Sequence, residues 1–171
     1  MKFKGRMWIF ADDDINTDVI FAGKYTYEPF TPEEMAEHAM EDYDPNFAKN
    51  VSKGDIIVAG KNFGCGSSRE QAVICLKAAG VSCIIAKSFA RIYYRNAINQ
   101  ALPVVISPEC SNFISSNQED LRNELISVNF KNGVVNIKDK SFDFPKLDEQ
   151  ALKIFEAGGL VGFTKKMLRE L

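Results

Sequence analysis

Residues 60–70 read Gly-Lys-Asn-Phe-Gly-Cys-Gly-Ser-Ser-Arg-Glu, and this glycine-bearing loop stands between an apolar run and an amphipathic segment. The run before it, residues 55–59, is short and rich in β-branched side chains, which is typical of a buried strand. After it, apolar residues recur at the spacing of a helix face until Gly80. The sequence therefore predicts a strand, a loop and a helix over residues 55–79.

Within the loop, Ser67 and Glu70 are three residues apart and fit a capping box, so we expect Ser67 to be the N-cap of a helix over 68–79. The first helical amides and Arg69 would then form an electropositive cradle for an anionic ligand, or for an anionic oxygen on Ser67. A purely structural cap explains the same residues. Arg69 stands where a dinucleotide-binding loop or a nucleophile elbow needs glycine, so those two templates are rejected.

Two more apolar runs, residues 82–86 and 102–106, flank a helical segment over 89–100. A strand, a crossover helix and a second strand within about 30 residues make a βαβ unit, whose strands are parallel and whose connection is right-handed. Ligands of such sheets bind beyond the carboxyl ends of the strands, where the loop with Ser67 lies. Arg91 and Arg95 share one helix face; they are either solvated or in contact with an anion or a partner subunit.

The flanking segments read more simply. Residues 7–10 predict a strand, followed by an acidic loop over 12–18 whose side chains either bond local amides or border an active site. The loop lacks the glycine and glutamate positions of a calcium-binding EF-hand. Thr31 followed by proline predicts a helix start, with the helix running to about Asp42.

The C-terminal third has a different character. Residues 125–130 and 134–138 predict a β-hairpin around Asn132-Gly133, a pair that supplies the positive φ angles of a tight turn. Asp148 is expected to cap a helix that runs to Ala157, with Leu152 and Phe155 facing inward, and Gly158-Gly159 to end it.

Length and composition predict one globular core and therefore a single domain over residues 1–171. The formal net charge is −2, which gives no basic excess for a nucleic-acid backbone. No apolar run approaches the ~20 residues that span a bilayer, and the first residues lack the apolar core of a signal peptide. We therefore expect a cytoplasmic protein that binds neither nucleic acid nor membrane.

The four cysteines form no C-x-x-C pair, which argues against a zinc or iron–sulfur site within this chain, so no metal ligand is predicted. Cys75 and Cys83 fall in apolar surroundings and read as core residues. Cys65 lies between two glycines beside Ser67, where it either packs or acts as a reactive thiol. His38 is the only histidine, so no serine–histidine or cysteine–histidine couple is expected.

Three segments in register, residues 13–18, 62–70 and 87–92, resemble the swivel domain of the aconitase superfamily. The resemblance is closest to the separate small subunits of the isopropylmalate dehydratase and homoaconitase type, and it runs from about Phe3 to Leu160. It implies an α/β fold, a swivelling β/β/α domain with a parallel βαβ core and a β-hairpin appendage.

The resemblance also implies roles for individual residues. Ser67 matches the base that removes a proton next to a carboxylate, and Ser68 and Arg69 match neighbours that contact the substrate carboxylate and the serine oxygen. A larger partner subunit is implied to carry a [4Fe-4S] cluster that activates the substrate hydroxyl, with no cofactor in this chain. The loop implied to read the substrate's substituent comprises Lys24, Tyr25, Thr26 and Tyr27.

The implied activity is a hydro-lyase, active only with the large subunit, that isomerises 2- and 3-isopropylmalate in leucine biosynthesis. A homoaconitase or dimethylmalate dehydratase small subunit, or a non-catalytic anion-binding module, remains open as an alternative. Gln71 stands where many members have histidine, and residues 25–28 depart from the family's usual loop. Thr26 and Tyr27 favour an uncharged alkyl substituent on the hydroxy diacid, whereas Lys24 either points to solvent or provides a cation. The complex is expected to be a heterodimer or heterotetramer.

Overall fold

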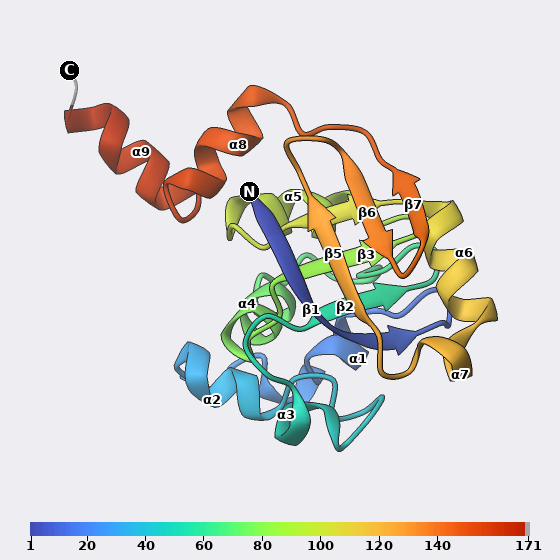
Figure 1. The fold of residues 1–171 in the computed structure, drawn as a ribbon. Coiled ribbons are helices and arrows are strands. Elements are labelled where there is room, and N and C mark those ends of the chain that lie inside the picture. The colour runs from blue at the N-terminus through green and yellow to red at the C-terminus, as the bar shows by residue number, and fades with distance from the viewer. Residues whose placement is uncertain (170–171) are drawn as a thin grey trace.

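The protein folds around one seven-stranded sheet whose strand order is β4-β3-β2-β1-β5-β6-β7 (Figure 1). The structure is a computed structural model that describes residues 1–169. Its strands are β1 (Lys2–Phe10), β2 (Ile56–Ala59), β3 (Cys83–Ala86), β4 (Val104–Ile106), β5 (Leu125–Asn129), β6 (Val134–Ile137) and β7 (Lys140–Asp143).

The parallel half of the sheet confirms the predicted βαβ core. β1, β2, β3 and β4 run parallel, with Ile57 opposite Trp8 on one side and Ile84 on the other. All residues of β2 and β3 are buried, because helices or loops cover both faces of a parallel sheet and an apolar run without alternation results. The crossover helices are α4 (Gln71–Ala78) and α5 (Arg91–Asn99).

The predicted hairpin forms and joins the parallel strands in the same sheet through β1. Residues 7–10 of β1 pair with β2, whereas residues 2–6 pair antiparallel with β5. The strand is thus longer than the predicted 7–10. Only Gly133 of the Asn-Gly pair has a positive φ, 70°, so the connection between β5 and β6 is longer than the expected tight turn.

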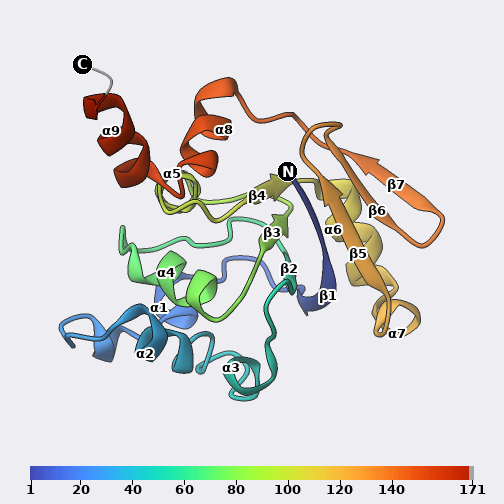
Figure 2. The same ribbon diagram turned by 60° about the vertical axis from the view of Figure 1, so that its left-hand side comes forward.

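Two helical layers enclose the sheet (Figures 1 and 2). On one face, Ile57, Ile84 and Val104 belong to a core cluster shared with α4 and α5. Shorter helices extend this layer: α1 (Thr17–Ile20), α2 (Pro32–Glu37) and α3 (Phe47–Asn50). On the other face, the core cluster is shared with the curled β5–β7 strands, α6 (Pro108–Ser116) and α7 (Gln118–Leu121).

Helix boundaries follow the capping residues where local chemistry decides them. Thr31 and Glu34 form the expected capping box, although α2 ends at Glu37 rather than near residue 42. Asp148 caps α8 (Glu149–Glu156) through a 2.7 Å hydrogen bond from the Ala151 amide. In α8 the buried side chains are Ala151 and Ile154, so the expectation that Leu152 and Phe155 face inward was shifted by one residue.

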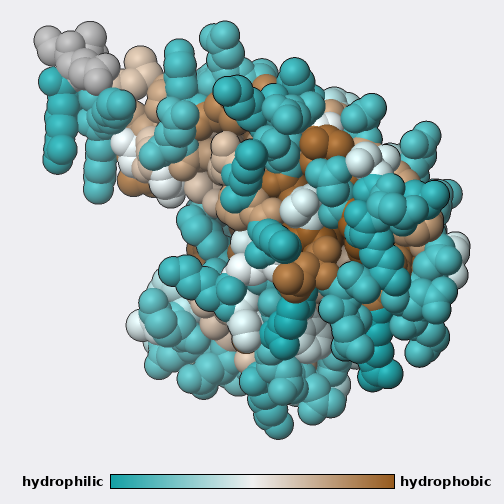
Figure 3. Space-filling view, viewed as in Figure 1, coloured by the Kyte–Doolittle hydropathy of each residue, from teal (hydrophilic) through white to brown (hydrophobic). Residues whose placement is uncertain are grey.

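The C-terminal helix α9 (Leu160–Arg169) stands out from the body beside α8. Figure 3 shows hydrophobic side chains on this arm as well as on the middle of the same face of the molecule. The exposed apolar side chains of α9 are Leu160, Val161, Met167 and Leu168.

Asp55 links the start of β2 to β1. Its carboxylate, 4% exposed, accepts hydrogen bonds from Arg6 Nη2 at 2.7 Å, from Trp8 Nε1 at 3.0 Å and from the Ser52 amide at 2.9 Å. Burial raises the pKa of Asp55, but these hydrogen bonds outweigh it, so the pKa lies below its ordinary value. Asp55→Ala removes a buried carboxylate together with its charge-assisted hydrogen bonds, and we expect it to cost about 2 kcal/mol of unfolding free energy.

The pH dependence of that cost provides a second readout. Because the folded-state pKa is lowered, the stabilisation is present above the unfolded pKa of about 3.9 and is lost as pH falls through the folded value. Urea unfolding of wild type and Asp55→Ala should show a difference at pH 7 that shrinks in acid. Asp139→Ala, at an exposed turn, is the control. A difference that stays constant with pH would contradict the role of the ionised carboxylate.

Candidate functional site

Two loops meet where β1 and β2 end. The segments after β1 and β2 run side by side away from the strand ends (Figure 2), joined by a parallel bridge between Asn16 and Cys65. The Thr17 amide donates to the Cys65 carbonyl at 2.8 Å, and the Gly64 amide donates to the Ile15 carbonyl at 2.8 Å. The acidic loop and the Ser67 loop therefore form one unit at the carboxyl edge of the sheet, where ligands of parallel sheets bind.

Acidic side chains of the first loop help to hold the second. Asp13 Oδ1 accepts a hydrogen bond from the Lys61 amide at 2.6 Å, and Asp14 Oδ1 accepts one from Asn62 Nδ2 at 2.7 Å. Asn16 caps α1 through its bond from the Val19 amide. Only Asn16 bonds a local amide, as a simple turn would predict, whereas Asp13 and Asp14 bond the second loop.

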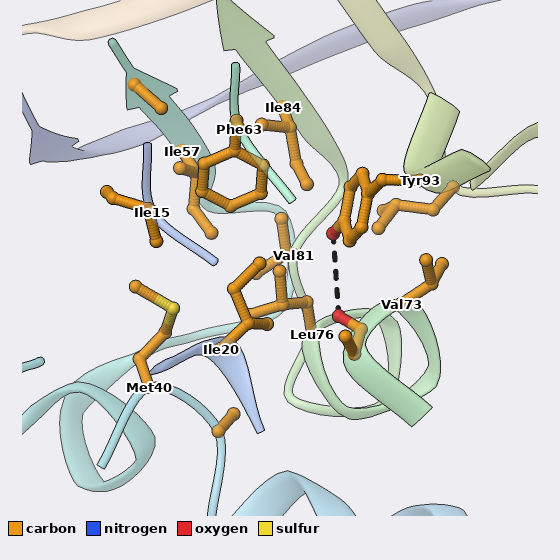
Figure 4. Packing of buried hydrophobic residues seen from close by; sticks show 14 of the residues in the cluster. Ile15, Ile20, Met40, Ile57, Phe63, Val73, Leu76, Val81, Ile84 and Tyr93 are labelled. Carbon is orange, nitrogen blue, oxygen red and sulfur yellow. Dashed lines mark hydrogen bonds between the residues drawn. The ribbon is translucent and has the colours of Figure 1, made fainter. Parts of the chain in front are cut away.

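Helix α5 packs against the Ser67 loop and holds it in place. Figure 4 shows the Tyr93 ring beside Phe63, with its hydroxyl directed at the Ala72 carbonyl 3.4 Å away. Gly64 has a φ of 77°, and a Cβ at this position would lie 2.1 Å from Tyr93 Cγ, so only glycine fits. One turn further along α5, Asn96 Nδ2 donates to the Ser68 carbonyl at 3.1 Å. The loop is thus held at both ends by one helix.

The prediction that Ser67 is the N-cap of the following helix was wrong. α4 begins at Gln71, and Glu70 occupies the cap position with helical backbone angles and no capping side-chain bond. The Glu70 carboxylate accepts from Gln100 Nε2 at 3.2 Å instead. The Ser67 hydroxyl bonds Thr17, 50 residues away, and Arg69 instead of a helix amide. The helix amides therefore do not surround Ser67, and the nearest positive charge is Arg69.

The Ser67 hydroxyl lies between two hydrogen-bonding groups. Arg69 Nε donates to Ser67 Oγ at 2.8 Å, and Thr17 Oγ1 lies 3.0 Å from the same oxygen. Thr17 Oγ1 also accepts from the Ser67 amide at 3.1 Å, which leaves the threonine hydroxyl hydrogen free to point at Ser67 Oγ. Thr17 is 1% exposed, whereas Ser67 is open to solvent. This arrangement favours a negative charge on Ser67 Oγ, because both neighbours can donate to it.

Arg69 connects three parts of the site. Besides Ser67, its Nη1 donates to Thr26 Oγ1 at 2.7 Å, and its Nη2 forms an ion pair with Asp18. The Arg69 side chain is 13% exposed, while the Asp18 side chain is 65% exposed. A planar guanidinium with five donors can hold all three partners in one geometry, which an ammonium cannot do. The guanidinium is therefore fixed between the two loops.

The segment 24–27 is placed beside this cluster by a short 3₁₀ helix, η1 (Gly23–Tyr25). Lys24 pairs with Glu41 at 2.9 Å, and this hydrogen bond raises the Lys24 pKa. The Tyr25 ring packs against His38 with the ring centroids 4.2 Å apart. Of the four residues 24–27, only Thr26 contacts Arg69, and Tyr27, 97% exposed, projects into solvent.

The four cysteines are spread over the Ser67 loop and both core layers. Burial and the nearby Asp14 raise the pKa of Cys65, so its thiol is less reactive than an ordinary cysteine. Cys75 lies in the core layer of α4, whereas Cys83 and Cys110 lie in the opposite layer. Within residues 1–169, no group of three or more His, Cys, Asp or Glu side chains is placed to hold a metal ion. In the same residues, no helix combines the length and apolar character needed to cross a bilayer.

The predicted site residues do not all belong to one hydrogen-bonded group. Ser67, Arg69 and Thr26 form one hydrogen-bonded group, whereas Ser68 is exposed and only its carbonyl is bonded, to Asn96 of α5. Sequence reasoning gave no individual role to two partners of this group, Thr17 and Asp18, although both lie in the acidic loop. A buried threonine next to an aspartate, in a loop that meets Ser67, is the signal that could have identified them.

Comparison with known proteins gives consistent results. The model of the aconitase C-terminal domain family matches residues 6–109. A 3-isopropylmalate dehydratase small subunit from Heliobacterium modesticaldum is 46% identical, with 99% of each chain covered. Small subunit 1 from Methanopyrus kandleri is 47% identical over 95% of this chain and 92% of its own. The crystal structure of a 3-isopropylmalate dehydratase from Methanocaldococcus jannaschii superposes with a TM-score of 0.85 at 42% identity, covering 98% of this chain and 95% of that one.

Proposed function

Because the chain belongs to the aconitase C-terminal domain family, among the 3-isopropylmalate dehydratase small subunits, we propose that it is the small subunit of a hydro-lyase interconverting 2- and 3-isopropylmalate. The observation that carries the proposal is the Ser67 hydroxyl, open to solvent and held by Arg69 and Thr17. It lies at the edge of the sheet where a partner subunit can close over a substrate. The chain acts as one domain over residues 1–171 in this proposal.

Ser67 accepts the proton in the proposed reaction. The C–H bond next to a substrate carboxylate breaks, the proton passes to the Ser67 alkoxide, and hydroxide leaves the neighbouring carbon to give an unsaturated diacid. Water then adds back with the hydroxyl on the other carbon. A serine oxygen is a poor base unless its anion is stabilised, and the fixed donors on Arg69 and Thr17 provide that stabilisation without reorganisation.

Departure of hydroxide needs a Lewis acid, and the cysteines of this chain are dispersed, with Cys75 in one core layer, Cys83 and Cys110 in the other, and Cys65 in the Ser67 loop. We assign that chemistry to a [4Fe-4S] cluster on a larger partner subunit, which polarises the substrate hydroxyl when bound. The four free cysteines suit a reducing compartment, and we propose that the complex works in the cytoplasm.

Recognition of the substituent is assigned to the segment 24–27. Thr26 already bonds Arg69 and Gly23, so it positions the segment, and the free ring of Tyr27 is the group left to cover the substituent. Lys24 is held by Glu41 and supplies no additional free cation. This composition suits the uncharged isopropyl group better than the extra carboxylate of homocitrate or citrate. Ser68 and Arg69 contact the substrate carboxylates in this proposal.

The decisive experiment is turnover by the chain co-purified with its large subunit and reconstituted anaerobically with iron and sulfide. We expect the pair to convert 3-isopropylmalate, with lower kcat/KM for dimethylmalate, citrate and homocitrate, and the single chain to be colourless and inactive. A preference for a tricarboxylate would contradict the assigned substrate. Turnover by the single chain would contradict the assignment of the Lewis acid to a partner subunit. A chain that binds carboxylates but has no catalytic partner would favour a non-catalytic anion-binding module.

Thr26→Val tests whether segment 24–27 acts through Arg69. Valine keeps the shape but removes the acceptor for Arg69 Nη1, so we expect kcat/KM to fall about tenfold, equivalent to ~1.4 kcal/mol. Thr26→Ser retains the hydroxyl and should recover most of the activity. A near-normal kcat/KM for Thr26→Val would show that the hydrogen bond does not matter for positioning.

A further inference from the structure

A hollow of about 790 Å³ lies beside the site, between α5 and the carboxyl end of the edge strand β4. Phe89, Tyr94 and two exposed isoleucines, Ile92 (42% exposed) and Ile106 (40% exposed), contribute its apolar walls. The guanidinium-bearing side chains of Arg91 and Arg95 complete the lining. An exposed apolar surface rimmed by charge is typical of an interaction site.

The two arginines are unusually placed for a free helix. Arg91 is the first residue of α5 and Arg95 follows one turn later, while the first turn contains no acidic residue. Cations at a helix N-terminus are unfavourable, because the helix dipole places positive charge there. Among residues 1–169 neither guanidinium takes part in an ion pair. Both side chains are exposed and are available to carboxylates from outside this part of the chain.

The hollow is continuous with the functional edge. The Phe63 amide donates to the Ser88 carbonyl at 3.1 Å, and the Ala90 amide donates to the Phe63 carbonyl at 3.0 Å, so the segment that opens α5 is hydrogen-bonded to the Ser67 loop. One face of α5, with Tyr93 and Asn96, holds that loop, while the neighbouring face lines the hollow. A subunit that covers Ser67 therefore also approaches this face.

From these observations we propose that the α5–β4 hollow, defined by Phe89, Arg91, Ile92, Tyr94, Arg95 and Ile106, is a docking site for the large subunit. The occupant is a segment of that subunit with an apolar side chain flanked by carboxylates, because the walls are apolar and the rim carries two arginines that form no ion pair within residues 1–169. Arginine is enriched among residues that dominate binding energy at interfaces. The inference rests on the proposed function, which requires a larger partner.

The test measures binding and catalysis separately. Arg91→Glu/Arg95→Glu is titrated against the large subunit from the same organism, with Kd measured directly and kcat measured at saturating large subunit. We expect Kd to rise at least tenfold, an increase of the size seen for hot-spot arginines, and kcat at saturation to stay within about twofold of wild type. Ile106→Gln, which removes part of the apolar wall, should also raise Kd.

Arg122→Glu is the matched control, because this exposed arginine follows α7 on the opposite side of the sheet. The Kd of this variant for the large subunit should equal that of wild type. An unchanged Kd for the double variant would overturn the docking site while leaving the proposed function intact. A kcat that stays low at saturating partner would also overturn it, since the arginines would then act on substrate. Sedimentation of the chain alone tests a different occupant. A homodimer of the wild-type chain that the double variant abolishes would overturn the proposal, because the hollow would then bind a second copy of the chain. If wild type binds the large subunit tightly but turns over no hydroxy diacid, the proposed function is refuted. The Kd values of the variants still decide whether the hollow is the docking site.

Discussion

Ser67→Ala is expected to lower kcat of the two-subunit complex by at least ~10²-fold, the usual scale for removing a positioned base. The Ser67 hydroxyl is the group to which Arg69 Nε and Thr17 converge, and alanine leaves no oxygen to take the proton. KM should change little, because the remaining donors still face the substrate. Steady-state kinetics at saturating large subunit and equal iron content measures both quantities.

The same variant should unfold with a free energy within about 1 kcal/mol of wild type, because the serine is exposed and does not cap α4. A large loss of stability would show that Ser67 has a structural role despite its position. Ser68→Ala is the neighbouring comparison, since Ser68 is equally exposed and is proposed to contact a substrate carboxylate, so its loss should raise KM rather than lower kcat. If Ser68→Ala costs as much kcat as Ser67→Ala, the base is not Ser67.

Arg69→Lys is expected to have the second largest effect, at least ~10²-fold in kcat/KM, because it removes donors that stabilise the developing charge. The guanidinium reaches Ser67, Thr26 and Asp18 at once, whereas a lysine ammonium on a flexible stem cannot hold all three. The charge is retained, so the variant separates geometry from net charge. Arg69→Gln, which removes the charge as well, should be at least as impaired.

A matched control for the arginine is Arg95→Lys, on the exposed face of α5, which should leave kcat/KM at saturating large subunit unchanged. Kinetics of the three variants at saturating partner measures the differences directly. Near-normal kcat/KM for Arg69→Lys would mean that a positive charge alone suffices. The guanidinium hydrogen bonds to Ser67, Thr26 and Asp18 would then not be needed for catalysis.

The parallel core was predictable because burial on both faces leaves a direct mark on the sequence. Ile56–Ala59 and Cys83–Ala86 are unbroken apolar runs, and no polar residue interrupts them because no edge of either strand meets water. The N-terminal half of β1 was missed for the opposite reason. Residues 2–6 carry alternating lysine, phenylalanine and arginine around Gly5, whose missing side chain accommodates the Gly54 carbonyl, a contact 49 residues away in the chain that local patterns cannot reveal.

In the site too, local features were predictable from the sequence and long-range contacts were not. The position of Ser67 at the end of β2 follows from the strand and loop pattern, but its hydrogen-bonding partner Thr17 lies 50 residues earlier. The capping-box pattern counts only local competitors for the serine hydroxyl, so it placed the helix start three residues too early. Helix α6 was not predicted, since its periodicity is weak between Pro108 and Ser116 and its buried residues include Ser111.

The central claim is that Ser67 breaks the C–H bond within a two-subunit complex. Single-turnover formation of the unsaturated diacid from 3-isopropylmalate, followed by its ultraviolet absorbance, isolates that step from rehydration and product release. At saturating large subunit, the wild-type complex should form the unsaturated diacid at least ~10²-fold faster than the Ser67→Ala complex, with similar affinity for substrate in both. Formation of the diacid by Ser67→Ala at close to the wild-type rate would contradict the claim.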